Sequence, residues 1–83
     1  MKILYFASLR ERLDRAEEEV TPPASVATIA DLISWLRQRD EAADLAMSQP
    51  EIIGAAIDAK KVAHSTPIAG AKTIALFPPM TGG

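Results

Sequence analysis

The segment Thr28–Leu36, TIADLISWL, carries the pattern on which the predicted fold depends. Thr28 followed three residues later by Asp31 is a capping-box-like helix start, with an acidic side chain near the positive helix end. Four apolar residues then recur at helical spacing and form one stripe along a helix face: Ile29, Leu32, Ile33 and Leu36. Trp35 borders this stripe and is interpreted as a packing residue. The segment therefore predicts one main amphipathic helix.

Apolar runs of strand type lie towards both ends of the chain. Residues Ile3–Ala7 (ILYFA) and Thr73–Phe77 (TIALF) are apolar on both faces, as expected of strands that are covered on both sides. Two such strands belong side by side in the middle of one sheet, and the stripe of the main helix can then cover a face of that sheet. The prediction is an α+β grasp, in which a sheet curls around one main helix.

Shorter elements are expected between these runs. Leu9 and Leu13 lie four residues apart and indicate a short helix over Ser8–Asp14. The acidic run in Glu17–Thr21 is typical of a solvated edge strand, and the prolines that follow end it. A helical stretch is expected over Glu41–Ser48. Ile53, Ala55 and Ile57 alternate as in a half-buried strand, and Asp58–Lys61 is expected to turn the chain back towards Val62.

Composition and charge exclude several classes of function. The 83 residues suffice for one domain, and 48% hydrophobic with 24% charged residues is ordinary for a globular protein. The net charge of −2 gives no general attraction to nucleic acid or to an anionic membrane. The apolar runs are far shorter than the ~20 residues that span a bilayer. A soluble cytoplasmic protein without a signal peptide, a nucleic-acid partner or a membrane partner is expected.

The chain has no cysteine and a single histidine, His64. Disulfides, cysteine metal sites and side-chain thiol nucleophiles are therefore excluded, and no metal site is expected at His64. If the protein handles sulfur, a group other than a side chain must carry it.

The last six residues are set apart by their composition: Pro78, Pro79, Met80, Thr81, Gly82 and Gly83. Prolines cannot continue a central strand, so we expect a domain over residues 1–77 and an exposed tail over residues 78–83. Two terminal glycines make a slender end whose carboxylate can enter a narrow enzyme channel. Adenylation gives that carboxylate a good leaving group, and a sulfur nucleophile can then yield a thiocarboxylate, with other proteins supplying the catalysis. The alternative is a frayed terminus without a role.

Two motifs resemble the small subunit of molybdopterin synthase. They are Phe6-Ala7-Ser8-Leu9-Arg10-Glu11 after the first strand, and the ending Phe77-Pro78-Pro79-Met80-Thr81-Gly82-Gly83. The start of the main helix, Thr28–Leu32, matches the same family. The loop before the last strand matches it too, with Thr66-Pro67-Ile68 followed by Gly70. The resemblance covers the whole chain in length and element order.

The resemblance implies a ubiquitin-like β-grasp whose functional residue is Gly83, with Gly82 as its slender approach. An E1-like adenylating enzyme would activate Gly83 with ATP, and a sulfur donor would convert it to a thiocarboxylate. The tail would then enter the large catalytic subunit, in a heterotetramer, and pass sulfur to cyclic pyranopterin monophosphate in molybdenum cofactor biosynthesis. The chain itself would be a non-catalytic, sulfur-donating subunit that binds no cofactor. The partner-binding residues expected are Phe77, Pro78, Pro79, Met80 and Thr81.

The chain departs from that family at one hairpin. Asp58-Ala59 stands where relatives often have Asn-Gly, and the preceding Ile52-Ile53-Gly54 lacks the usual basic residue. A different hairpin shape and an altered partner fit are therefore expected. Met80 stands where relatives often have a small or β-branched residue.

Several interpretations stay open at this level. Phe77 is either an interface anchor or a core residue of the last strand. Arg10 and Arg12 lie on a solvated helix face or pair with acidic groups of an activating enzyme. The chain as a whole can be a thiamine-pathway sulfur carrier, a ubiquitin-like modifier or an interaction module. An acyl carrier protein is disfavoured, because Ser34 lies in mid-helix rather than at a helix start.

Overall fold

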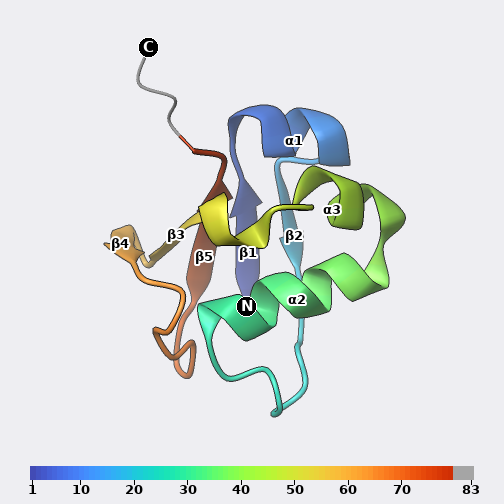
Figure 1. The fold of residues 1–83 in the computed structure, drawn as a ribbon. Coiled ribbons are helices and arrows are strands. Elements are labelled where there is room, and N and C mark those ends of the chain that lie inside the picture. The colour runs from blue at the N-terminus through green and yellow to red at the C-terminus, as the bar shows by residue number, and fades with distance from the viewer. Residues whose placement is uncertain (80–83) are drawn as a thin grey trace.

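The computed structural model describes residues 1–79 of the chain (Figure 1). Its elements are, in order, β1 (Lys2–Tyr5), α1 (Ala7–Leu13), β2 (Glu17–Glu19), α2 (Ile29–Arg39), α3 (Glu41–Ala46), the 3-10 turn η1 (Pro50–Ile52), β3 (Gly54–Ile57), β4 (Lys60–Val62) and β5 (Thr73–Phe77). The strands form one mixed sheet in the order β2-β1-β5-β3-β4, in which β1 and β5 are parallel neighbours. The predicted α+β grasp and its central pair of strands are confirmed. Within residues 1–79, no helix has the length and apolar character needed to cross a membrane.

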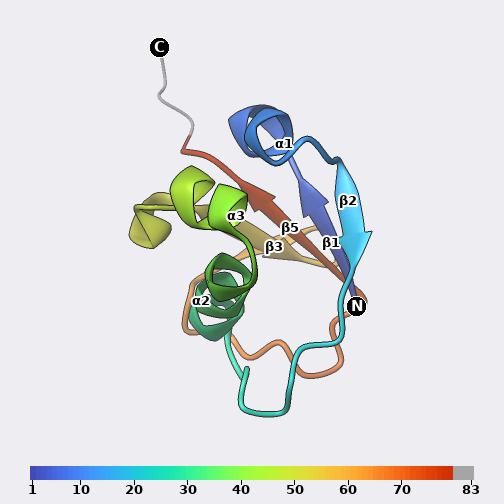
Figure 2. The same ribbon diagram turned by 90° about the vertical axis from the view of Figure 1, so that its right-hand side faces the viewer.

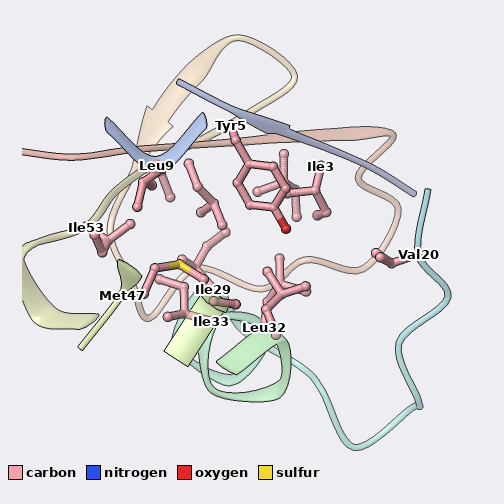
Figure 3. Close-up of a cluster of buried hydrophobic side chains, with 14 of the residues drawn as sticks. Ile3, Tyr5, Leu9, Val20, Ile29, Leu32, Ile33, Met47 and Ile53 are labelled. Atoms are coloured by element: carbon pink, nitrogen blue, oxygen red, sulfur yellow. The ribbon is translucent and has the colours of Figure 1, made fainter. Parts of the chain in front are cut away.

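The main helix α2 forms as its sequence predicts. The Thr28 hydroxyl accepts a hydrogen bond from the Asp31 amide, and the Asp31 carboxylate accepts one from the Thr28 amide, both at 3.2 Å. This is the predicted capping box. All four residues of the stripe are at most 1% exposed, and Figure 3 shows three of them facing Ile3 and Tyr5 of the sheet. Burial of each such side chain stabilises the fold by about 1.5–3 kcal/mol. Trp35 is a packing residue at the edge of the core, as predicted.

The expectation that the central strands are covered on both faces is wrong. Side chains alternate along a strand, and in β1 and β5 every second residue is almost completely buried: Ile3, Tyr5, Ile74 and Leu76. The residues between them are only half-buried. Figure 2 shows α2 and α3 on the same side of the sheet. An apolar run on its own does not reveal whether a second layer covers it, and among residues 1–79 no helix covers the other face of the sheet, which we call the open face.

Four predicted elements have different ends in the structure: Ile3–Ala7, Ser8–Asp14, Glu17–Thr21 and Glu41–Ser48. The first two shift because Ala7, with a φ of 51°, already starts α1, and Asp14, with a φ of 54°, caps its end. The acidic edge strand β2 ends at Glu19, before the prolines. The helix α3 ends at Ala46, and the unpredicted 3-10 turn η1 follows with Pro50 at its start, where a missing backbone donor costs little.

The hairpin between β3 and β4 keeps the shape for which Asn-Gly is usual. Asp58 and Ala59 have φ values of 47° and 75°, the left-handed pair that a two-residue hairpin turn requires. The Asp58 carboxylate supports this turn by accepting a hydrogen bond of 3.0 Å from the Thr73 amide. The expected change of hairpin shape is therefore not found. Lys60 and Lys61, which were predicted in the turn, belong to β4.

A polar network joins β1 and β2 to the start of α3. The Tyr5 hydroxyl donates to the Glu18 carboxylate at 2.6 Å. Arg15 bridges Glu18 at 3.2 Å and Asp40 at 2.7 Å. Asp40 in turn caps α3 by accepting from the Ala42 amide at 2.9 Å. This arrangement fixes the α2–α3 junction over the edge of the sheet.

The network shifts the pKa of its acidic members. Burial raises the pKa of the Tyr5 hydroxyl, and the hydrogen bond to Glu18 raises it further. For Glu18, burial alone would raise the pKa, but the hydrogen bonds from Tyr5 and Arg39 and the nearby arginine charges lower it overall. The hydrogen bond from the Ala42 amide, followed by that from Arg15, lowers the pKa of Asp40.

Replacing Glu18 should therefore weaken the fold and flatten its response to acid. A carboxylate whose pKa is depressed by folding stabilises the protein fully above its ordinary pKa of 4.5 and loses that contribution as the pH falls through the lower folded pKa. We expect Glu18→Gln to lower Tm at pH 7 by about 4–8 °C, the effect of ~1 kcal/mol in a domain of this size. Calorimetric melting from pH 7 to pH 3 should show a smaller further loss for the variant than for the natural protein. Parallel curves would contradict this role for Glu18.

Candidate functional site

The site begins where the central strand β5 ends. Phe77 is the last residue of β5. The next residue, Pro78, is half-buried, Pro79 is exposed, and neither belongs to a strand. Figure 1 shows that this segment leaves the sheet at the same end as α1. The predicted roles of Met80, Thr81, Gly82 and Gly83 concern residues outside the described part of the chain. We call Pro78-Pro79 the tail root.

Phe77 lies on the open face of the sheet and not in the core. It alternates with the buried Leu76 and is itself only half-buried. In the antiparallel register between β5 and β3 it stands directly opposite Gly54. The Phe77 ring covers this glycine so closely that a Cβ atom at position 54 would overlap it. The absence of a side chain on Gly54 is therefore what allows the ring to lie flat on the sheet. The core interpretation of Phe77 is wrong.

Phe6 extends this aromatic surface, and the sequence analysis did not assign it to the site. Its side chain is 47% exposed, an unusual exposure for a large apolar residue. Its backbone is extended and its amide donates to the Leu76 carbonyl at 3.2 Å. Phe6 thus continues the alternation of β1, which places it on the open face in the row of Phe77 and Gly54. The aromatic residue was missed because, in the apolar run Ile3–Ala7, it was taken as part of a doubly covered strand.

Together these residues make a flat apolar surface beside the tail root, which we call the tail-end face: Leu4, Phe6, Gly54, Ala75 and Phe77. The five residues are apolar, and the ion pair of Lys2 with Glu17 borders them at Leu4. An aromatic surface of this kind can dock against another protein, since aromatic residues often dominate the energy of interfaces.

The described residues gather no catalytic or metal-binding constellation at this place. Across residues 1–79, no three His, Asp or Glu side chains cluster as ligands of a metal ion would. His64 bonds through its Nε2 to the Ile53 carbonyl oxygen at 2.6 Å. What the described residues show at this end of the molecule is the tail-end face beside the tail root.

The comparisons with known proteins agree with this geometry. Residues 3–83 match the model of the ThiS family. No curated protein is significantly similar to the chain. The crystal structure of SAMP1 from Haloferax volcanii superimposes with a TM-score of 0.73 at 24% identity, covering 100% of this chain and 98% of that chain. A putative molybdopterin converting factor, subunit 1, from Pyrococcus furiosus gives a TM-score of 0.72 at 23% identity, covering 94% of each chain. At such identities these structures establish the fold alone, a ubiquitin-like β-grasp.

Proposed function

This chain belongs to the ThiS family of ubiquitin-like sulfur carriers, and we propose that it is the sulfur carrier subunit of a molybdopterin synthase. The observation that carries the proposal is the ending Phe77-Pro78-Pro79-Met80-Thr81-Gly82-Gly83, which starts at the last residue of the central strand. The family match reaches Gly83 and so includes this ending. The likeness in fold to a molybdopterin converting factor subunit is consistent with the same role.

In this proposal Gly83 is the reacting residue. Its carboxylate oxygen attacks the α-phosphorus of ATP on an E1-like adenylating enzyme, so that pyrophosphate leaves and an acyl-adenylate forms. A sulfur donor then displaces AMP and leaves a thiocarboxylate, which passes its sulfur to cyclic pyranopterin monophosphate in the large catalytic subunit. Because the cosubstrate ATP belongs to the activating enzyme, the chain itself needs no bound cofactor. ATP also makes the cytoplasm the expected compartment.

The described residues contribute position and not catalysis. Strand β5 pairs with β1 on one side and β3 on the other, so the tail root starts from the most constrained strand of the sheet. The two prolines restrict the backbone where it leaves. The tail-end face lies beside this exit and is the surface on which we expect the large subunit to dock, with Phe77, Pro78, Pro79, Met80 and Thr81 in the interface.

Truncation of Phe77 should weaken this docking more than it weakens the fold. We expect Phe77→Ala to reduce the affinity for the large subunit by ~2 kcal/mol or more, the loss typical of an interface hot spot. Loss of stability should stay well below the ~3–5 kcal/mol of a buried phenylalanine. A binding titration and calorimetric melting of the same variant separate the two effects.

A second variant tests the position of the ring without removing it. Gly54→Ala places a Cβ where the Phe77 ring lies and must displace that ring from the sheet. We therefore expect Gly54→Ala to weaken binding in the same direction as Phe77→Ala, and the double variant to lose less than the sum of the two. Unchanged binding in Phe77→Ala would remove this residue from the interface.

Reconstitution tests the proposed function directly. The thiocarboxylated protein is mixed with its large subunit and cyclic pyranopterin monophosphate in a single turnover. Each thiocarboxylate delivers one sulfur atom and the dithiolene contains two, so the molybdopterin formed should be half the carrier consumed. Absence of molybdopterin while the thiocarboxylate persists would contradict a role in this pathway.

The likeness to SAMP1, a small archaeal modifier protein, favours one second candidate, a ubiquitin-like modifier. The same activated Gly83 would then form isopeptide bonds with lysines of other proteins. Peptide mapping of the host proteome distinguishes the two functions, because a modifier leaves the C-terminal residues of this chain attached to lysine side chains and a sulfur carrier does not.

A further inference from the structure

A groove of about 230 Å³ lies directly against the tail root, on the helical side of the sheet. Its lining comes from α1, the end of α3, the segment that leads into η1, η1 itself and the tail root, and half of it is apolar; the residues used below are Ser8, Arg12, Ser48, Gln49, Ile52 and Pro78. Figure 1 shows how α1, the end of α3 and η1 come together near the point where the chain leaves β5. The groove therefore adjoins Pro78 and Pro79, where the described part of the chain ends.

The groove presents a cation together with hydrogen-bond donors. Arg12 is exposed on α1, and three residues with hydrogen-bonding side chains, Ser8, Ser48 and Gln49, line the same space. None of the described residues that line it is acidic. Ile52, which is 46% exposed, adds an apolar rim. This combination suits one carboxylate with an apolar neighbour.

Arg12 also differs from most other arginines of the chain. Arg15, Arg37 and Arg39 each form an ion pair with an aspartate or glutamate. Within residues 1–79, neither Arg10 nor Arg12 has such a partner, but only Arg12 lines the groove at the tail root, since Arg10 lies at a separate hollow with Glu11 and Asp14. Among the described residues, Arg12 therefore places one unpaired positive charge at this groove.

We propose that this groove receives an aspartate or glutamate side chain of the adenylating enzyme, and that Arg12 is its principal ligand. The inference rests on the proposed function and deepens it by assigning a partner contact. The adenylating enzyme is the partner chosen because activation of Gly83 is common to the sulfur carrier and to the modifier, so the chain must meet this enzyme in either role. The occupant is acidic because Arg12 is the one charged group among the described lining residues.

An exposed ion pair suits a carrier that must dock, react and leave. Charges at the rim of an interface mainly accelerate association, and they add little to the lifetime of the complex. Loss of the contact should therefore raise KM for the carrier and leave kcat nearly unchanged. This rise in KM should become smaller at high salt, because salt screens the two charges.

The test is ATP–pyrophosphate exchange by the cognate adenylating enzyme at saturating ATP, with the concentration of the full-length carrier varied. Arg12→Glu is expected to raise KM for the carrier about tenfold and to leave kcat within about twofold, since the variant repels the carboxylate in the encounter. Arg12→Gln should raise KM less. The matched control is Lys72→Glu, the same charge reversal at an exposed residue just before β5, at the opposite end of that strand from the tail root. It should change KM by less than about twofold, because salt screens charges at that distance.

The outcomes separate this inference from the proposed function. If Arg12→Glu and the natural protein have the same KM, or if Lys72→Glu raises KM as much as Arg12→Glu, the groove assignment is wrong while the proposed function stands. If the natural protein supports no exchange at all, both are wrong. A rise in KM specific to Arg12 that shrinks at high salt, with Tm unchanged, supports the assignment.

Discussion

Deletion of Gly83, or addition of one residue after it, should abolish adenylation and sulfur transfer and leave the folded domain unchanged. The reacting group in this account is the terminal carboxylate, and one residue displaces it by ~3.5 Å. Displacements of about 1 Å already cost on the order of 10²-fold in rate when reacting groups must be aligned. Within residues 1–79 the buried core runs from Ile3 to Leu76, and we expect Tm to move by no more than a degree or two.

The measurements are ATP–pyrophosphate exchange, molybdopterin formation and calorimetric melting on the same samples. Thr81→Ser is the matched control, because it keeps the length of the tail and the terminal glycines. A protein truncated by Gly83 that still supports molybdopterin formation would show that the terminus is not the carrier group.

Replacement of Gly82 should slow both steps in the order glycine, alanine, valine. A tail that threads a narrow channel must pass with its backbone close to the channel walls, and a Cβ at the penultimate position collides there. We expect Gly82→Ala to slow adenylation and Gly82→Val to slow it by roughly 10²-fold, the scale of a misplaced reacting group. Neither change should alter Tm, because residue 82 lies beyond the last strand.

Pyrophosphate exchange followed by single-turnover transfer to the pterin precursor checks the order. Equal rates for Gly82→Val and the natural protein in both assays would mean that no narrow channel is involved. The small size of Gly82 would then have no role in the reaction.

The start and the buried face of the main helix were predictable because their signals are local, while its end at Arg39 was not predicted. The capping pair Thr28 and Asp31 and the stripe from Ile29 to Leu36 specify a start, a direction and a buried face within nine consecutive residues. The pairing of the two terminal strands was also predictable, since both are apolar and hydrophobic burial drives them to the centre of the sheet. The open second face was not predictable, because the apolar runs ILYFA and TIALF do not determine whether helices cover one face of the sheet or both.

The candidate site was likewise predictable only in part. The exposed tail could be proposed from the sequence, and stays a prediction, because prolines and glycines act on their own backbone without any tertiary partner. The place of Phe77 depends on its register with Gly54, a residue 23 positions earlier in the chain (77 − 54). The surface role of Phe6 and the groove at Arg12 likewise depend on elements that meet only in the folded protein. No local pattern marks Arg12 as different from the arginines that form ion pairs.

The intact mass of the protein isolated from its own host shows whether its terminus carries sulfur. We expect a species heavier by the exchange of one oxygen for one sulfur, with the increment localised to the C-terminal fragment and lost when Gly83 is deleted. A chain that carries no sulfur at its terminus in a host actively making molybdopterin, or that carries the increment elsewhere, would contradict the assignment of this protein as a sulfur carrier.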